Sequence, residues 1–262
     1  MPGYISHTVM ARDTYKKINR KDINPDYMIT YSLGGDLCKY SKCRYASHHQ
    51  DMDTFIYNMA DYLKMNNLTK DSELLGVLYG HICHYIMDNT IHPLVRIIDK
   101  TCLHNKRNHT LVELYYDAYL TKNILNMRID KYAKGKLLIA KNNKKVNKMI
   151  DYAYKTTYQT NNISRYYKFN LWLYRKIKYL YYLLGYKLLR KITGIDKFLN
   201  NNKNVDLINK NNLIIYKDYQ KKECHDDLIT SYHISLNRAL AYISDIDKYL
   251  KIWQMFGFMI RY

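Results

Sequence analysis

Glycine and proline are scarce in this sequence: the 262 residues include nine glycines and three prolines. A β-sandwich needs a turn about every ten residues, and these turn-forming residues are too few to supply them. Their scarcity excludes that architecture and favours long helices with few interruptions. Apolar residues make up 47% of the chain, enough for a well-buried core. We predict an all-α fold, a compact multi-helix arrangement in which residues 1–262 form a single domain.

Signals for secretion and for membrane insertion are also lacking. The first residues contain no basic region followed by an apolar run, so a signal peptide is not expected. The most apolar stretch, residues 172–189, contains four lysine or arginine residues and is too charged to cross a bilayer, so no transmembrane segment is expected. The five cysteines are irregularly spaced and do not resemble a disulfide framework. Together these absences predict a cytoplasmic protein.

Acidic residues are the third scarcity. Lysine and arginine number 42 against 23 aspartates and glutamates, for a formal net charge of +19, and only three of the acids are glutamates. Between Lys134 and Lys191, fifteen basic residues accompany one acid, Asp151. Such a basic segment would attract phosphate groups on nucleic acid or on an anionic membrane. A drift towards AT-rich codons would also enrich lysine, but it would enrich glutamate too, so this explanation is the weaker one.

The spacing of apolar residues predicts a series of helices. They cover residues 4–18, 51–66, 72–92, 107–127, 134–158, 164–192 and 223–242, with a last helix from 243 to the end. Ser72 is the expected N-terminal cap of the third helix, which should end at His92 because Pro93 follows. A polar, asparagine-rich loop is expected over residues 199–213.

Histidines and acids recur at four-residue intervals in the third and fourth helices. His84, Asp88 and His92 share one helix face, because a four-residue step turns a helix only about 40° beyond a full turn. Imidazole and carboxylate groups stacked in this way are suitable ligands for zinc. His109 and Glu113 repeat the same spacing on the following helix. If the two helices pack together, we expect five ligands to converge in one buried pocket.

Each of these residues has an ordinary explanation when it is taken alone. A single histidine near an apolar face is usually a hydrogen-bonded core residue, and a histidine with an acid four residues away is a common surface ion pair. Two neighbouring helices that both present such a pair beside apolar residues are much less expected by chance. The metal site is therefore the better interpretation.

The same residues resemble the zinc-dependent phospholipases C, a family related in fold to the single-strand-specific zinc nucleases. The family carries an H-x-x-x-D element, a later histidine and an H-x-x-x-E element, and the matching residues here are His84 with Asp88, His92, and His109 with Glu113. The N-terminal Gly3-Tyr4-Ile5-Ser6-His7 resembles the family's early histidine. Residues 32–36 resemble its glycine-rich approach to an aspartate, Asp36. The resemblance covers residues 1 to about 120.

What the resemblance implies is an all-α fold of the phospholipase C and zinc nuclease type, with metal ligands in residues 1–120 and a basic, tyrosine-rich helical part in residues 130–262. It also implies two or three zinc ions per chain. The first would be held by Asp36, His48 or His49, His84 and Asp88, the second by His92, His109 and Glu113, and the third by His7 with a shared Asp88. Asp36 is in addition the candidate catalytic residue, which would orient or deprotonate the attacking water.

The sequence departs from the secreted members of this family in two ways. These carry an N-terminal tryptophan that contributes to the third zinc site, and no such tryptophan is present here. The gap between Asp88 and His92 is also shorter than in the secreted enzymes.

The prediction for function is a zinc-dependent hydrolase of phosphodiester bonds, similar to phospholipase C. The substrate would be a phospholipid at an anionic membrane surface. One alternative is a zinc nuclease acting on single-stranded nucleic acid, which the basic charge would suit. The other is a non-enzymatic helical module with structural zinc.

Aromatic and cationic residues alternate between Tyr166 and Tyr186. This stretch would suit a membrane interface or stacking on bases. We prefer a plainer interpretation, in which the rings pack inward and the lysines reach past them to solvent.

Overall fold

The fold is organised around one long buried helix, α5 (Ser72–Ile98). The computed structural model describes residues 3–43, 51–100, 106–135, 140–201, 205–218 and 221–259. His48 and His49, one of which is a predicted ligand, lie outside these residues. The described chain is mainly helical, so the prediction of an all-α fold is confirmed.

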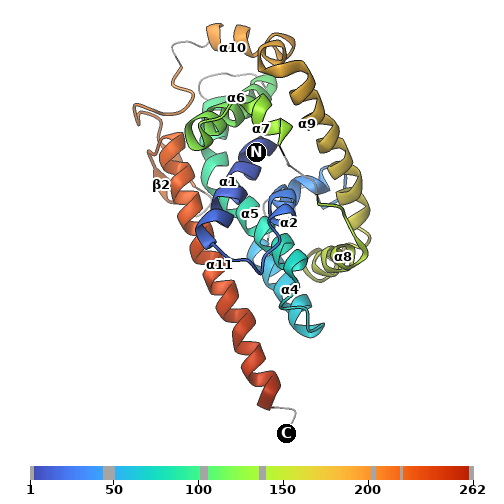
Figure 1. Cartoon of the computed structure of the whole chain (residues 1–262). Coiled ribbons are helices and arrows are strands. Elements are labelled where there is room, and N and C mark those ends of the chain that lie inside the picture. The colour runs from blue at the N-terminus through green and yellow to red at the C-terminus, as the bar shows by residue number, and fades with distance from the viewer. Residues whose placement is uncertain are drawn as a thin grey trace.

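Helices from both halves of the chain surround α5, as Figure 1 shows. Those from the first half are α1 (Tyr4–Ile18), α2 (Pro25–Tyr31), the 3-10 helix η1 (Gly34–Cys38), α4 (Met52–Met65) and α6 (Lys106–Leu125). They are followed by α7 (Ile129–Lys134), α8 (Lys144–Tyr158), α9 (Ser164–Thr193), α10 (Ile195–Asn201) and α11 (Leu228–Met259). Helix α11 packs along α5, and α9 lies at the outer edge of the molecule.

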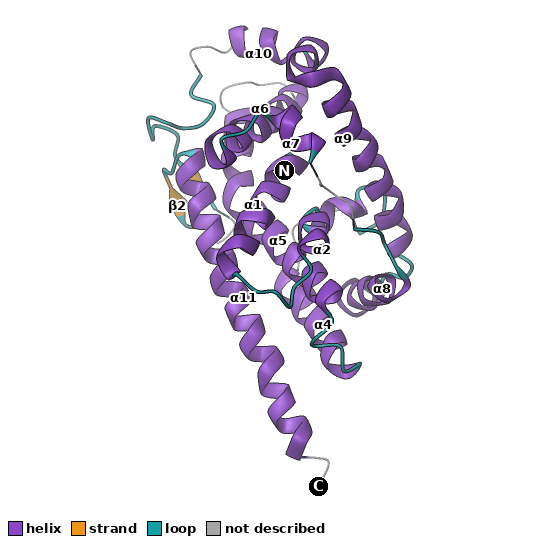
Figure 2. Ribbon diagram, in the orientation of Figure 1, coloured by secondary structure: helices purple, strands orange, loops and turns teal. Residues whose placement is uncertain are grey.

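The only strands in the described residues form a two-stranded antiparallel ladder, β1 (Tyr216–Lys217) and β2 (Glu223–Cys224). Figure 2 shows how small this ladder is beside the helices. It lies in the segment between α10 and α11, close to the C-terminal end of α5.

Two glycines allow α2 to approach α5 closely. A Cβ atom added at Gly76 would lie 2.6 Å from the carbonyl oxygen of Asn24, and one added at Gly80 would lie 2.6 Å from that of Met28. Because these glycines are four residues apart, they lie on one face of α5 and leave a groove that receives the α2 backbone. The same approach brings the end of α2 next to His84.

Several helix boundaries differ from the prediction, two of them in α5. The cap of α5 is Asp71, whose side chain accepts hydrogen bonds from the backbone N–H groups of Glu73 and Leu74, and not Ser72. Helix α5 continues through Pro93 to Ile98.

Other differences lie further along the chain. Of the helix predicted over residues 134–158, Lys134 is the last residue of α7, and α8 begins only at Lys144, where Asn143 caps it by accepting a hydrogen bond from the N–H of Val146. The two helices predicted near the C-terminus are a single one, α11.

None of the helices in the described ranges is both long enough and apolar enough to span a bilayer.

Candidate metal centre

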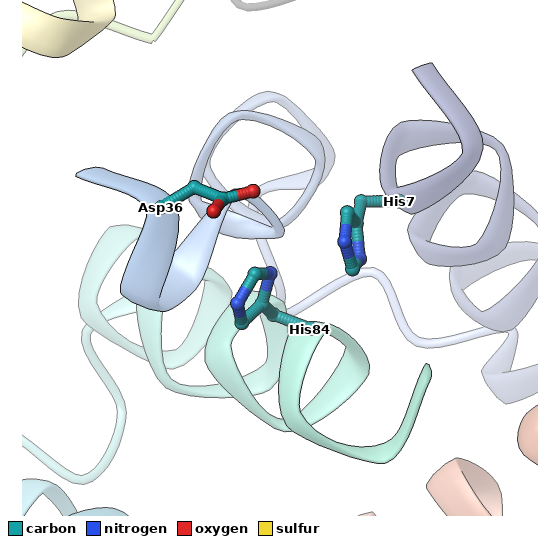
Figure 3. Close-up of side chains that lie close together, drawn as sticks. All are labelled: His7, Asp36 and His84. Atoms are coloured by element: carbon teal, nitrogen blue, oxygen red, sulfur yellow. The ribbon is translucent and has the colours of Figure 1, made fainter. Parts of the chain in front are cut away.

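Three elements that are distant in sequence bring ligand atoms together in the interior. His7 comes from α1, Asp36 from η1 and His84 from α5, and Figure 3 shows their side chains directed toward one another. One ligand atom from each residue lies within 4.8 Å of the others. These residues are 0%, 2% and 1% exposed, so the group is closed to bulk solvent. A buried cluster of two imidazoles and a carboxylate is suited to a divalent cation.

Asp88 adds a second carboxylate to this group. Its Oδ1 is 3.3 Å from Nε2 of His7, and its Oδ2 is 3.4 Å from Nε2 of His84. A tetrahedral zinc with bonds of about 2.0–2.1 Å would hold two donors roughly 3.3 Å apart. The observed separations match this spacing. Burial on its own would raise the pKa of Asp88, but the facing rings of His84 and His7 lower it well below its ordinary range.

Three buried polar atoms of His7 and Asp88 lack hydrogen bonds to the described part of the chain. Among the described residues, neither ring nitrogen of His7 and not Oδ1 of Asp88 makes one. A buried polar atom without a partner costs about 1–3 kcal/mol, and more when it is charged. A cation bound between His7 and Asp88 would satisfy these atoms, so the donor set fits a metal ion.

The orientation of His84 is set by its neighbours. Nδ1 lies 3.1 Å from the carbonyl oxygen of Ser32, and because a carbonyl can only accept, Nδ1 donates to it, which leaves Nε2 as the nitrogen that can bind a cation. Gly34 has φ +39°, and a Cβ atom there would lie 2.5 Å from Cγ of His84. The glycine-rich approach to Asp36 is thus required both by the backbone conformation and by the ring that packs on it.

A chain of buried hydrogen bonds fixes the far end of η1. His81 Nδ1 lies 2.8 Å from the carbonyl oxygen of Val77 and must donate to it, so its Nε2 accepts from the hydroxyl of Tyr167 at 2.9 Å. The Tyr167 hydroxyl then accepts from that of Tyr154 at 3.1 Å, and the Tyr154 hydroxyl accepts from the thiol of Cys38 at 2.9 Å. Each of these hydrogen bonds therefore has one possible donor and one acceptor. The series holds η1, and with it Asp36, in one position.

A second group of ligands lies where α5 meets α6. His92, His109 and Glu113 place one ligand atom each within 4.8 Å of the others. Nε2 of His109 is 3.1 Å from Oε1 of Glu113, and the His92 and His109 rings are 5.6 Å apart. Burial lowers the pKa of His92 to about 2, which keeps its imidazole neutral and able to bind a cation. The His109 and Glu113 side chains are 28% and 19% exposed, so this group is reached from solvent.

Asp99 completes the surroundings of His109, although the sequence pattern does not predict it. Its Oδ2 lies 3.5 Å from Nδ1 of His109, on the opposite side of the ring from Glu113. A carboxylate in this position fixes the orientation of a ligating histidine and increases its basicity. No spacing rule points to Asp99, because it lies in the segment between the two helices that carry the ligands.

The two groups are adjacent because α5 contributes to both. Asp88 and His92 are four residues apart, which is a rise of about 6 Å along the helix. In place of one pocket with five ligands, as the sequence predicts, the structure places His84 with Asp88 in the first group, and His92, His109 and Glu113 in the second.

A hollow of about 170 Å³ opens at the same end of α5. It is lined by Pro93, Arg96, Ile97, Lys100, Tyr216 and Lys217. Three of these side chains are cationic, and Pro93 directly follows His92. A negatively charged group that enters this hollow would be attracted by these cations.

The family model described as zinc dependent phospholipase C matches residues 4–178. The chain belongs to this family. The matched range contains every residue of both ligand groups. No curated protein and no solved structure matches the chain.

Membership of the zinc-dependent phospholipase C family agrees with the donors that the structure brings together. Neutral imidazoles and carboxylates are ordinary zinc ligands, and both groups consist of these two kinds of side chain. The family is zinc-dependent, and the structure provides two candidate places for the metal.

Proposed function

We propose that this protein hydrolyses the phosphodiester bond of phospholipids, as a zinc hydrolase of the phospholipase C type. The observation that carries the proposal is the buried convergence of His7, Asp36, His84 and Asp88 from three separate elements. The proposal is also supported by the chain's membership of the zinc-dependent phospholipase C family. Histidines that only form ion pairs at the surface would not need to converge in this way.

Two or three zinc ions would be held by these residues. His7, Asp36, His84 and Asp88 would hold the buried ion or ions, with Asp88 shared. His92, His109 and Glu113 would hold the ion nearer to solvent. When bound, zinc supplies positive charge that neutralises the phosphate oxygens and lowers the pKa of bound water.

The chain's own residues would bind and orient the substrate. The phosphodiester would approach from the side of His109 and Glu113, the exposed part of the centre. Arg96, Lys100 and Lys217 in the neighbouring hollow would attract its negative charge. The Asp36 carboxylate, held rigidly on η1, would orient the attacking water and accept its proton.

The test is hydrolysis by the zinc-loaded protein of phosphatidylcholine, of an anionic phospholipid and of single-stranded DNA. We expect a phosphorylated headgroup to be released from the lipids. His84→Ala and Asp36→Asn should reduce the rate to background. His225→Ala is the matched control, because this histidine is 53% exposed and its Nε2 lies 3.6 Å from Oε1 of Glu223 at the surface. Equal rates for His84→Ala and His225→Ala would refute the assignment.

A zinc nuclease is the second candidate, and the net charge of +19 favours it. Cleavage of single-stranded DNA without release of a lipid headgroup would support the nuclease. Bound zinc with no cleavage of either substrate would instead indicate a structural role for the metal.

A further inference from the structure

Helix α9 carries a row of large apolar side chains on its outer face. Phe169, Trp172, Tyr179 and Leu180 are 50%, 54%, 56% and 50% exposed. They lie within one side of the helix, because the spacings of three, seven and eight residues are close to whole turns. The preferred expectation, that the rings of this stretch pack inward, is wrong for these residues.

The opposite face of the same helix is buried against the rest of the protein. Tyr167 and Asn170 are fully buried, and Leu171 is almost so. The Asn170 side chain donates to the carbonyl oxygen of Leu37 at 2.9 Å, next to Asp36 on η1. The apolar side chains of the outer row are therefore not needed to pack α9 onto the protein.

Tyr40 extends the row beyond α9. It follows η1, is 55% exposed, and its ring lies 5.9 Å from that of Phe169. The ring of Phe169 in turn lies 6.1 Å from that of Trp172. We call the five residues Tyr40, Phe169, Trp172, Tyr179 and Leu180 the α9 face.

Cations border the α9 face, and acids are missing from the helix. Residues 164–193 include eight lysines or arginines and no aspartate or glutamate. Arg165, Lys168 and Lys176 are exposed on the same side as the rings, and Nζ of Lys176 lies 6.0 Å above the ring of Trp172. Aromatic residues flanked by cations suit the boundary between headgroups and acyl chains of an anionic bilayer.

We propose that the α9 face docks the protein onto an anionic phospholipid bilayer. The inference rests on the proposed lipid substrate and names the surface that would bring the protein to it. The rings would lie at the level of the headgroups, and the cations would contact anionic lipids. Because the inner side of α9 is bonded to η1, docking would place the bilayer at a fixed distance from Asp36.

The composition of the face favours lipid over nucleic acid. Single-stranded nucleic acid is bound by stacking bases on aromatic rings, to which an aliphatic side chain contributes little. Leu180 belongs to the face, and Leu188 on the same helix is 44% exposed. The helix also lies at the outer edge of the molecule (Figure 1), where a flat surface can reach it.

The first experiment measures co-sedimentation of the full chain with vesicles of phosphatidylcholine, with and without phosphatidylglycerol. We expect preferential binding to the anionic vesicles. The double variant Phe169→Ser with Trp172→Ser should lower the partition coefficient by roughly tenfold or more. Lys168→Glu with Lys176→Glu should lower it by at least about fivefold for each cation lost. Leu213→Ser is the matched apolar control, because this side chain is 78% exposed elsewhere, and Lys248→Glu is the charge control.

The second experiment separates docking from catalysis. The variants of the α9 face should hydrolyse a short-chain, monomeric phosphatidylcholine as fast as the unaltered protein, while their rate on anionic vesicles falls. Vesicle binding that depends on the face, in a protein that cleaves no lipid, would leave docking standing and refute the proposed function. Unchanged vesicle binding in both double variants would overturn docking, whatever the activity.

Two other occupants of the face have their own outcomes. If a second copy of the chain covers it, the unaltered protein will dimerise in sedimentation and Phe169→Ser with Trp172→Ser will be monomeric. If nucleic acid covers it, the double variants will lose binding to single-stranded DNA and keep binding to vesicles. Either result overturns the membrane proposal. Unchanged circular dichroism and thermal unfolding of the variants exclude misfolding as the cause of any loss.

Discussion

His81 lies one turn before His84 on α5 and belongs to neither ligand group. Its two nitrogens are committed to Val77 and Tyr167, so it acts as the end of the hydrogen-bond chain that fixes η1. Burial lowers the pKa of His81 to about 4. This group gives the protein a stability that depends on pH.

Acid should destabilise the protein through His81. Between about pH 6.5 and pH 4, His81 binds a proton in the unfolded chain but stays neutral in the folded protein. The contribution of His81 to stability is therefore complete above pH 6.5 and is lost as the pH falls. The slope approaches about 1.4 kcal/mol per pH unit. Urea unfolding of the unaltered protein and of His81→Gln at several pH values in this range measures it. We expect the variant to be less stable at neutral pH and to lose less on acidification. Parallel pH curves would contradict the assignment.

The sequence predicts which ligand residues lie together where helical spacing alone determines their relative positions. The four-residue steps from His84 to Asp88 and from His109 to Glu113 are properties of a helix, so they could be read from the sequence. The distances from His7 and Asp36 to His84 depend on the packing of three elements, and only the family resemblance indicated them. Asp99 could not be predicted, because its relation to His109 depends on the path of the chain between α5 and α6.

At the scale of elements, η1 is positioned by contact with α5. Gly34→Ala should disturb this contact, because the added methyl group would meet the His84 ring and φ is +39°. We expect a loss of about 1–3 kcal/mol in unfolding free energy and a lower zinc content. Gly135→Ala is the control, since its nearest contact would be 3.2 Å and its φ is −64°. Equal zinc content in the two variants would argue against a role for Gly34.

Helix α1 is capped by a residue of another helix. Gly3, at its N-cap, has no side chain for this purpose, and Asp117 of α6 accepts hydrogen bonds from the backbone N–H and hydroxyl of Ser6 at 2.7 and 2.6 Å. A third comes from the N–H of Ile5 at 3.3 Å. Asp117 therefore ties the helix that carries His7 to the helix that carries Glu113.

Removing this tie should destabilise the protein. Asp117→Ala would leave buried donors of α1 without partners, and we expect a loss of about 3 kcal/mol. Thermal unfolding with the zinc-loaded chain measures it, and zinc content reports whether His7 has moved. Asp245→Ala is the control, because its side chain is 66% exposed and pairs with Lys248. A cost no greater than that of the control would show that α1 is held by other contacts.

Most helices could be predicted from the sequence, and the errors have physical causes. Pro93 does not end α5, because burial of the helix on several sides outweighs the cost of one interior proline, about 3 kcal/mol. Within the predicted helix of residues 134–158, the cap at Asn143 makes α8 begin at Lys144. No glycine or proline lies near Tyr242 and Ile243, so the helix continues past them as α11.

At the scale of the whole molecule, metal would add a direct link between α1, η1 and α5, which are distant in sequence. A ligand that binds only the folded state stabilises it by about 4 kcal/mol when it is present at a thousand times its dissociation constant. For a chain of this length we expect chelation to lower the melting temperature by roughly 10 °C. Scanning fluorimetry with a chelator, followed by added zinc, tests this. A melting temperature that neither treatment changes would contradict a buried metal centre.

The sharing of α5 by both ligand groups constrains how such a centre can change. Along a helix, positions are available only in steps of about 1.5 Å and 100° per residue. Inserting a single residue between Asp88 and His92 would swing the imidazole a quarter of a turn or more away from His109. The spacing between the two sites can therefore change only in whole-residue steps. During evolution it could change by an insertion in α5 or by a new ligand from another helix, but not gradually.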